Sequence, residues 1–266
     1  MSKLSLSKAW DETGEILIRD GRLYSSVALA LIVFPQTIFG LFSPRSGVIT
    51  PLAWVFLLLS LVIGFAAQIA LNRLAVGPST TVGAAIGRGF ARMPAVVGSF
   101  LMLMAALMIV LIFVVLILSA AGLMASPQAG AEPPALLLAI ILILTAACWA
   151  IFILAVPVAA VEHGGSVHIL KRSWELSRGV YWRLLAFVAL LFSSFIIVIL
   201  AGQFAIGSAI TAAFGRPDPG SLSALLISLV VALIQSVFTV LFGVMLARIY
   251  VQLAGRDSVS VPSSGA

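Results

Sequence analysis

The residues best suited to chemistry gather in one short segment that holds Glu162, His163 and His168. Metal-assisted hydrolysis needs several carboxylates and a histidine acid–base pair. Glu162 and His163 are chain neighbours, so on a helix they would point about 100° apart. His163 and His168 are five positions apart across Gly164 and Gly165, which is not a usual zinc-ligand spacing. We therefore expect no catalytic residue, metal site or cofactor here, and we interpret Glu162 as the partner of a nearby arginine.

A basic and aromatic cluster follows directly. It consists of Arg172, Trp174, Arg178, Trp182 and Arg183. One interpretation is an interfacial anchor, in which indole rings lie at headgroup depth and arginines extend toward water. The other is specific recognition of anionic phospholipid, since arginine can bind a phosphate through two hydrogen bonds. Each cation near an anionic leaflet contributes about 1 kcal/mol, enough for three arginines to concentrate a lipid without binding it tightly.

The composition requires lipid around most of the chain. Hydrophobic residues make up 62% of the 266 residues and charged residues 9%, whereas a soluble domain carries about 25% charged residues. Apolar runs approach or exceed the roughly 20 residues that cross a bilayer. We predict an all-α, polytopic membrane helix bundle with about six transmembrane helices. The predicted spans are residues 24–42, 51–72, 95–123, 135–158, 182–211 and 222–252.

The ends of the chain are more polar than the membrane domain of residues 24–252. Residues 1–23 are predicted to form an amphipathic helix along the membrane surface, leading into a first span that stays as a permanent anchor and is kinked at Pro35. Residues 253–266 are rich in serine and are predicted to be a disordered tail. The single cysteine, Cys148, lies inside an apolar run, so no internal disulfide can form.

The basic residues predict the orientation. With a cytoplasmic N-terminus, thirteen of the fifteen lysines and arginines fall on the cytoplasmic side, and only Arg45 and Arg216 fall opposite. Both termini are then cytoplasmic, which agrees with an even number of spans. Because the basic residues stand singly at the ends of apolar runs, we expect contact with membrane lipids rather than with nucleic acid.

Two linkers on the predicted cytoplasmic side, residues 73–94 and 159–183, are weakly alike. A shift of 84 positions places Arg88 over Arg172 and Phe90 over Trp174. Each linker predicts an amphipathic surface helix, with Arg88 and Arg92 on the polar side of the first. Together the two would form a basic collar at the cytoplasmic face.

The second linker and the residues around it resemble a known family. The residues that carry the likeness are Val-Pro-Val-Ala-Ala-Val-Glu (156–162), Gly-Gly (164–165), Leu-Lys-Arg-Ser-Trp-Glu-Leu-Ser-Arg-Gly (170–179) and Trp-Arg (182–183). This pattern is similar to that of the glycerophosphoryl diester phosphodiesterase membrane-domain family, and Ala9, Trp10 and Pro35 also fit its bacterial members. The resemblance implies a multi-span protein of a bacterial-type inner membrane. Some members carry a soluble phosphodiesterase domain, for which we expect no room here.

The function predicted from these features is non-enzymatic. We expect a lipid- or envelope-associated membrane domain that engages anionic lipid or a membrane or envelope protein partner through the basic collar; the oligomeric state stays open. The alternative is a small transporter or permease for a neutral or lipidic substrate. No ionisable residue lies in the middle of a predicted span, and the polar residues there suit bonds between helices. They are Gln36, Thr37, Gln68, Thr145, Ser193, Ser194, Gln203, Gln235 and Ser236.

Overall fold

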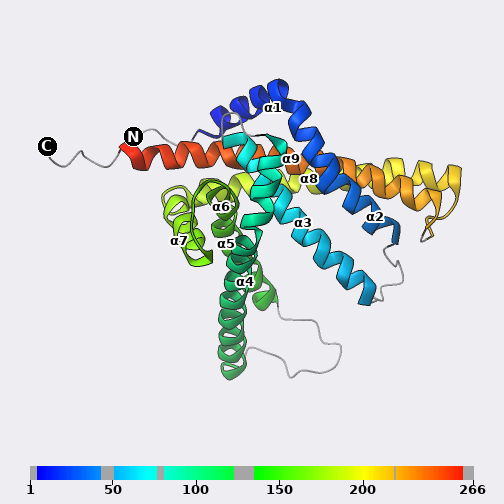
Figure 1. The fold of residues 1–266 in the computed structure, drawn as a ribbon. Helices are drawn as coiled ribbons and strands as arrows, with labels where there is room; N and C mark the ends of the chain where they lie inside the picture. The colour runs from blue at the N-terminus through cyan, green and yellow to red at the C-terminus, as the bar shows by residue number, and fades with distance from the viewer. Residues whose placement is uncertain (1–4, 43–50, 77–80, 123–134, 219, 260–266) are drawn as a thin grey trace, which may run out of the picture.

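The computed structural model describes residues 5–42, 51–76, 81–122, 135–218 and 220–259, and every regular element in them is a helix (Figure 1). The all-α prediction is therefore confirmed. The helices, in chain order, are α1 (Leu6–Ala28), the π-helical turn η1 (Leu29–Val33), α2 (Phe34–Phe42), α3 (Pro51–Val76), α4 (Val82–Ala120), α5 (Ala135–Phe152), α6 (Ala155–Val161), α7 (Ser166–Ser177), α8 (Tyr181–Phe214) and α9 (Leu222–Val259).

Five helical stretches are long and apolar enough to cross a membrane. Within the described residues they are Leu6–Leu41, Trp54–Val76, Val82–Ala120, Tyr181–Phe214 and Leu222–Gly255. Large apolar side chains face outward along them; Leu101, Met108 and Ile117 of α4, for example, are each at least 60% exposed. Such a surface is too large and apolar for water, so the chain is a membrane protein.

The fourth predicted span, 135–158, is not one helix. α5 ends at Phe152, and α6 begins at Ala155 in a changed direction. Pro157 explains the break, because it cannot donate a hydrogen bond to the carbonyl of Ile153 and its ring collides with that group. The stretch that qualifies as apolar here, Ala135–Trp149, is shorter than the other five.

The two predicted linker helices also differ from each other. The second linker contains α7, a separate helix of 12 residues. The described part of the first is not a separate helix, since residues 73–76 end α3 and residues 82–94 form the first turns of α4, which has 39 residues. Roughly 20 residues cross a bilayer, so a helix of 39 residues is longer than one crossing requires.

The region around Pro35 and the start of the tail differ from the prediction. Pro35 lies inside the helix α2, and the helical geometry changes one turn earlier, in the π-helical turn η1. The wider turn accommodates Pro35, which has no amide hydrogen to donate. Asp20 has non-helical dihedral angles, which marks the junction between the N-terminal polar segment and the first apolar run. The predicted tail is helical as far as Val259. Residues 1–4 and 260–266 and the predicted loops 43–50 and 124–134, Lys3 and Arg45 included, lie outside the described residues.

α6 occupies the centre of the packing. Its residues from Ala155 to Ala160 are all buried, and it packs against α3, α4, α7 and α9. A helix that is apolar on every side is expected to be enclosed in this way. A second apolar cluster joins α1, α3 and α9 around Tyr24, Leu71 and Val244. α9 therefore links both halves of the core.

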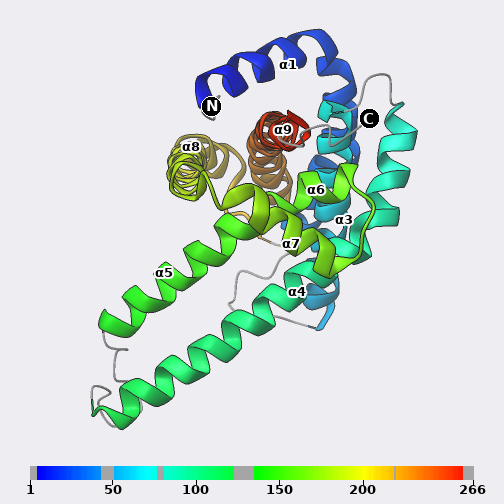
Figure 2. The ribbon, with the colours of Figure 1, turned by 90° about the vertical axis from the view of Figure 1, so that its left-hand side faces the viewer.

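The long helices project from this centre in two directions. α8 and α9 run side by side one way, whereas α4 and α5 run together another way, as the two views show (Figures 1 and 2). Helices that cross one bilayer tilt by at most about 40° from its normal, so they run in roughly similar directions. Because these two pairs diverge, the six-span topology stays a prediction. α6 and α7 lie where the two pairs meet, and the candidate functional site lies there too.

Candidate functional site

The site is built on the loop between α6 and α7. Glu162 ends α6 in an extended conformation, and the helix resumes at Ser166 after Gly164 and Gly165. The loop is fixed to α4 at Ser166, whose hydroxyl donates to the carbonyl of Ala95 at 2.9 Å, while Ser99 donates to the carbonyl of Ser166 at 3.1 Å. These bonds satisfy polar groups at the edge of an apolar core.

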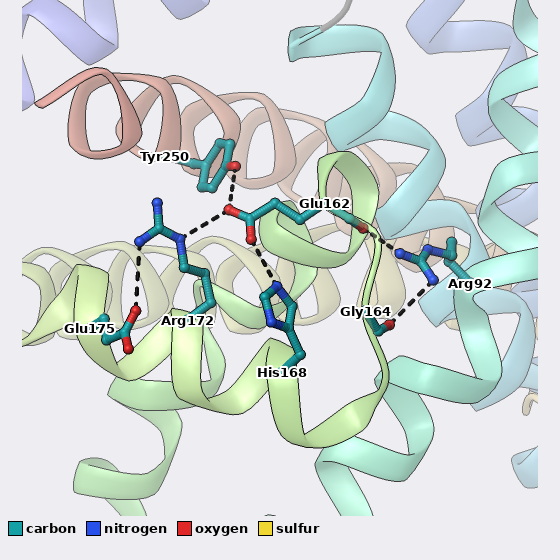
Figure 3. A network of polar contacts seen from close by, with 7 residues as sticks. All are labelled: Arg92, Glu162, Gly164, His168, Arg172, Glu175 and Tyr250. Carbon is teal, nitrogen blue, oxygen red and sulfur yellow. Dashed lines mark hydrogen bonds and ion pairs between the residues drawn. The ribbon is translucent and has the colours of Figure 1, made fainter. Parts of the chain in front are cut away.

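The Glu162 carboxylate accepts three hydrogen bonds from two helices (Figure 3). Oε1 accepts from the Tyr250 hydroxyl of α9 at 2.9 Å and from Nε of Arg172 at 3.1 Å, and Oε2 lies 3.1 Å from Nε2 of His168. Burial alone would raise the pKa of Glu162, but these donors and the charge of Arg172 lower it below its ordinary value. The carboxylate therefore stays ionised and ties α6, α7 and α9 together.

Two arginines of α4 reach the same loop from the opposite side. Arg92 donates to the carbonyls of Glu162 and, at 3.3 Å, of Gly164 (Figure 3). Nη2 of Arg88 lies 3.2 Å from Nε2 of His163. An arginine at the carboxyl end of a helix satisfies the last carbonyls and suits the helix dipole. Both arginines thus use neutral acceptors, and their positive charge is not compensated by these bonds.

Arg73, Arg88 and Arg92 form a group that we call the arginine triad. Arg73 lies in the last turn of α3, and the other two lie one turn apart on the extension of α4. Partial burial lowers the pKa of Arg88, and so does its repulsion by Arg73 and Arg92. The Nε atoms of Arg88 and Arg92 are buried without a hydrogen-bond partner among the described residues. Such a triad suits an oxyanion such as a phosphate.

The predicted basic and aromatic cluster is divided in the structure. Arg172 is held by Glu162 and also by Glu175 at 3.6 Å, so it has a structural role. Trp174, Arg178, Trp182 and Arg183, in contrast, are exposed around the turn from α7 to α8. We call these four residues the aromatic–basic turn. Trp182 is 77% exposed, which suits an indole that reaches into the interfacial layer.

The histidines do not form a metal site with Glu162. His168 contacts the Glu162 carboxylate, whereas His163 points to Arg88. Within the described ranges, no three side chains of the histidine, cysteine, aspartate and glutamate types come together as metal ligands would. The geometry of these residues is that of a structural network.

Sequence reasoning named Glu162, Arg88, Arg92 and Arg172, and the structure brings them to one loop. It missed Tyr250, which is 88 positions from its partner, and Arg73. The sequence did carry a signal for Arg73, because it directly follows a predicted span and begins the first linker, which contains no acidic residue. No local pattern links Tyr250 to Glu162, because that contact depends on how α9 packs on α6.

Comparison with known proteins gives one match. A family model described as a domain of unknown function, DUF7847, matches residues 8–253, which is nearly all of the helical part of the chain. No curated protein and no solved structure matches significantly.

Proposed function

The chain belongs to the DUF7847 family of domains of unknown function, and we propose that it is a non-enzymatic membrane domain that engages anionic phospholipid. The binding groups would be the arginine triad and the aromatic–basic turn. Under this proposal both surfaces face the cytoplasm of a bacterial-type cell and belong to its inner membrane. The likeness of residues 154–184 to the glycerophosphoryl diester phosphodiesterase membrane domain stays a prediction, and the proposal rests on the arginines instead.

The observation that carries the proposal is the uncompensated charge of the triad. Glu162, the acidic residue nearest in the loop, has its carboxylate occupied by Tyr250, Arg172 and His168. In the described residues, no carboxylate forms an ion pair with Arg73, Arg88 or Arg92. Like charges held together repel one another, so an added anion would relieve that repulsion.

The depth of these groups supports a lipid as the source of the anion. The triad lies at the ends of apolar helices, where lipid phosphates are abundant. The exposed Trp174 and Trp182 are side chains typical of the same layer. A phospholipid headgroup would thus meet both the cations and the aromatic rings, whereas a soluble anion would use the cations alone.

Lipid retention in native mass spectrometry tests the proposal. The protein is reconstituted in nanodiscs with equal phosphatidylglycerol and phosphatidylcholine, and the lipids that remain bound are counted. We expect wild type to retain phosphatidylglycerol, and Arg73→Gln with Arg88→Gln to weaken retention by about 2 kcal/mol, roughly thirtyfold in affinity. Arg178→Gln with Arg183→Gln should give a similar loss if the turn takes part.

A matched control is available at the other end of the spans. Arg216 is exposed in the loop between α8 and α9, and Arg216→Gln should leave retention unchanged. Equal retention of both lipids by wild type, or an equal loss in the Arg216 variant, contradicts the proposal. A protein that copurifies stoichiometrically and is lost from the triad variant, with lipid retention unaltered, would favour the partner-protein alternative.

The orientation has its own test. Reporter fusions at Ala131 and Gly179 should report opposite compartments, with Gly179 on the cytoplasmic side. Signals from the same compartment would contradict both the topology and the location proposed for the arginines.

A further inference from the structure

A cavity with both polar and apolar lining lies between the helices. Its volume is about 240 Å³, and its walls come from η1, α2, α3 and α9. Three glutamines that are distant in the sequence line it, namely Gln36, Gln68 and Gln235, together with Ser60 and Thr239. Sequence reasoning named the glutamines separately and assigned them to bonds between helices. The structure brings them to one space.

The cavity lies at the middle of three predicted spans. Its lining residues fall in 31–36, 60–68 and 235–239, near the centres of the spans 24–42, 51–72 and 222–252. Every lining side chain is uncharged. Since a charge at this depth is costly without a counter-charge, the cavity is suited to an uncharged ligand.

One of the lining side chains carries a polar atom that the described part of the protein leaves without a partner. Oε1 of Gln36 is buried and has no hydrogen-bond partner among the described residues, and neither has Oγ1 of the adjacent Thr37. A buried polar atom without a partner is costly, most of all where lipid surrounds the helices. The amide oxygen of Gln36 has almost no accessible surface, so an outside donor reaches it only when the side chain turns toward the cavity that it lines.

Open space is present at Gly64. This residue lines the cavity, and a Cβ placed on it would meet no atom within 4 Å. On the far wall, the Oε1 atom of Gln68 lies 3.1 Å from where a Cβ of Gly243 would be, so that glutamine extends toward α9. Leu31, Ile32 and Phe65 add apolar wall. The cavity thus combines amide groups with an apolar lining.

We propose that this cavity binds the hydroxyl-bearing headgroup of a neutral lipid, such as a diacylglycerol, with the hydroxyl donating to Gln36. A volume of about 240 Å³ is below the roughly 300–1,000 Å³ of pockets that enclose a whole ligand. Only the polar end of a lipid fits, and its chains lie outside. Leu61, on the rim, is 42% exposed, so the cavity borders the surface that faces the acyl chains.

Photolabelling of the full chain in nanodiscs tests this assignment. One probe is a diacylglycerol with a diazirine near its headgroup, and the matched probe carries a methyl ether in place of the hydroxyl. Peptides containing Gln36, Ser60 or Gln235 should be labelled by the first probe about fivefold more than by the second, the factor expected of one net hydrogen bond.

Two substitutions remove separate features of the cavity. Gly64→Leu fills the space, and Gln36→Leu removes the acceptor at nearly constant size. Both should abolish the preference for the hydroxyl probe. Gly207→Leu and Gln203→Leu on α8 are the matched controls, since a Cβ on Gly207 also meets open space and Gln203 is exposed. Both controls should label as wild type does.

The comparison of two probes on wild type does not depend on how any variant folds. Equal labelling by the hydroxyl and ether probes overturns the proposal, as does labelling confined to outer faces of the helices. A cavity that holds water only would give no labelled cavity peptide with either probe, and that result also overturns it. Loss of anionic lipid retention in the triad variants bears on the proposed function alone.

Discussion

The first linker, residues 73–94, and the second, residues 159–183, have similar sequences and different structures. Arg88 coincides with Arg172, and Phe90 with Trp174, when one is shifted onto the other, so the sequence predicts two copies of one surface helix. In the structure residues 82–94 of the first are the beginning of the long helix α4, whereas the second is interrupted at Glu162 and forms the separate helix α7. A shared pattern of charge thus does not determine whether a linker helix stands alone.

The acidic residues explain why the two sets of arginines behave differently. The second linker contains Glu162 and Glu175, and Arg172 is paired with both. The first linker contains no acidic residue, so Arg88 and Arg92 turn to a histidine and to backbone carbonyls. The second linker therefore uses its central cation for stability, and the first retains positive charge that can act on a ligand.

The largest effect should come from Gly89 in the first linker. A Cβ at this position would fall on the carbonyl of Ala66, where α4 crosses α3 at close range. A backbone atom cannot move aside as a side chain can. Gly89→Leu should therefore lower the free energy of unfolding by about 3 kcal/mol, the top of the range for overpacked sites. Unfolding by dodecyl sulfate, followed by circular dichroism, measures the loss.

Gly87 is the matched control on the same helix. A Cβ there meets no atom within 4 Å, so Gly87→Ala should raise stability by up to about 1 kcal/mol through helix propensity. If both substitutions had the same sign, the first linker would not be held against α3 in the manner described.

The second effect concerns Glu162. Glu162→Ala removes the acceptor of three side chains and leaves Arg172 partly buried without its main partner. We expect a loss of about 1–3 kcal/mol in the free energy of unfolding, and faster proteolysis within α7 than within the first turns of α4. Equal protease sensitivity of both linkers would contradict the contrast between them.

Periodicity and composition predicted most of the helices, because apolar runs of adequate length leave few alternatives in lipid. These signals failed where tertiary contacts determine the beginning or the end of a helix. The first linker was predicted to form a surface helix of its own, but residues 82–94 pack on α3 as the beginning of α4. Pro157 was predicted to lie within one continuous span, although α5 ends at Phe152 and Pro157 lies in the first turn of α6.

The sequence predicted which residues form the candidate site, but not which contacts they make. Arg88, Arg92, Arg172 and Glu162 were recognisable as charged residues beside apolar runs, but their partners were not. Arg92 bonds to a residue 70 positions away and Glu162 to one 88 positions away. Such pairs depend on the crossing of α4, α6 and α9, which leaves no local periodicity in the sequence.

The third effect is a loss of stability at low pH, which only the second linker should cause. The pKa of Glu162 in the folded protein is lower than the ordinary value of 4.5. The contribution of its network to stability is therefore complete above about pH 4.5 and is lost as the pH falls through the folded pKa. Unfolding in dodecyl sulfate between pH 6 and pH 3 should show a steeper loss for wild type than for Glu162→Gln, and parallel curves would contradict this.

The smallest effect should come from Glu175, the other carboxylate beside Arg172. Its side chain is 48% exposed and lies 3.6 Å from the guanidinium, so screening by water leaves little attraction. Glu175→Ala should change the free energy of unfolding by less than about 0.5 kcal/mol, because Glu162 still holds Arg172. The same variant should retain slightly more phosphatidylglycerol than wild type, since one acidic charge near the aromatic–basic turn is gone. A loss as large as that of Glu162→Ala would mean that the outer ion pair, and not the loop network, fixes α7.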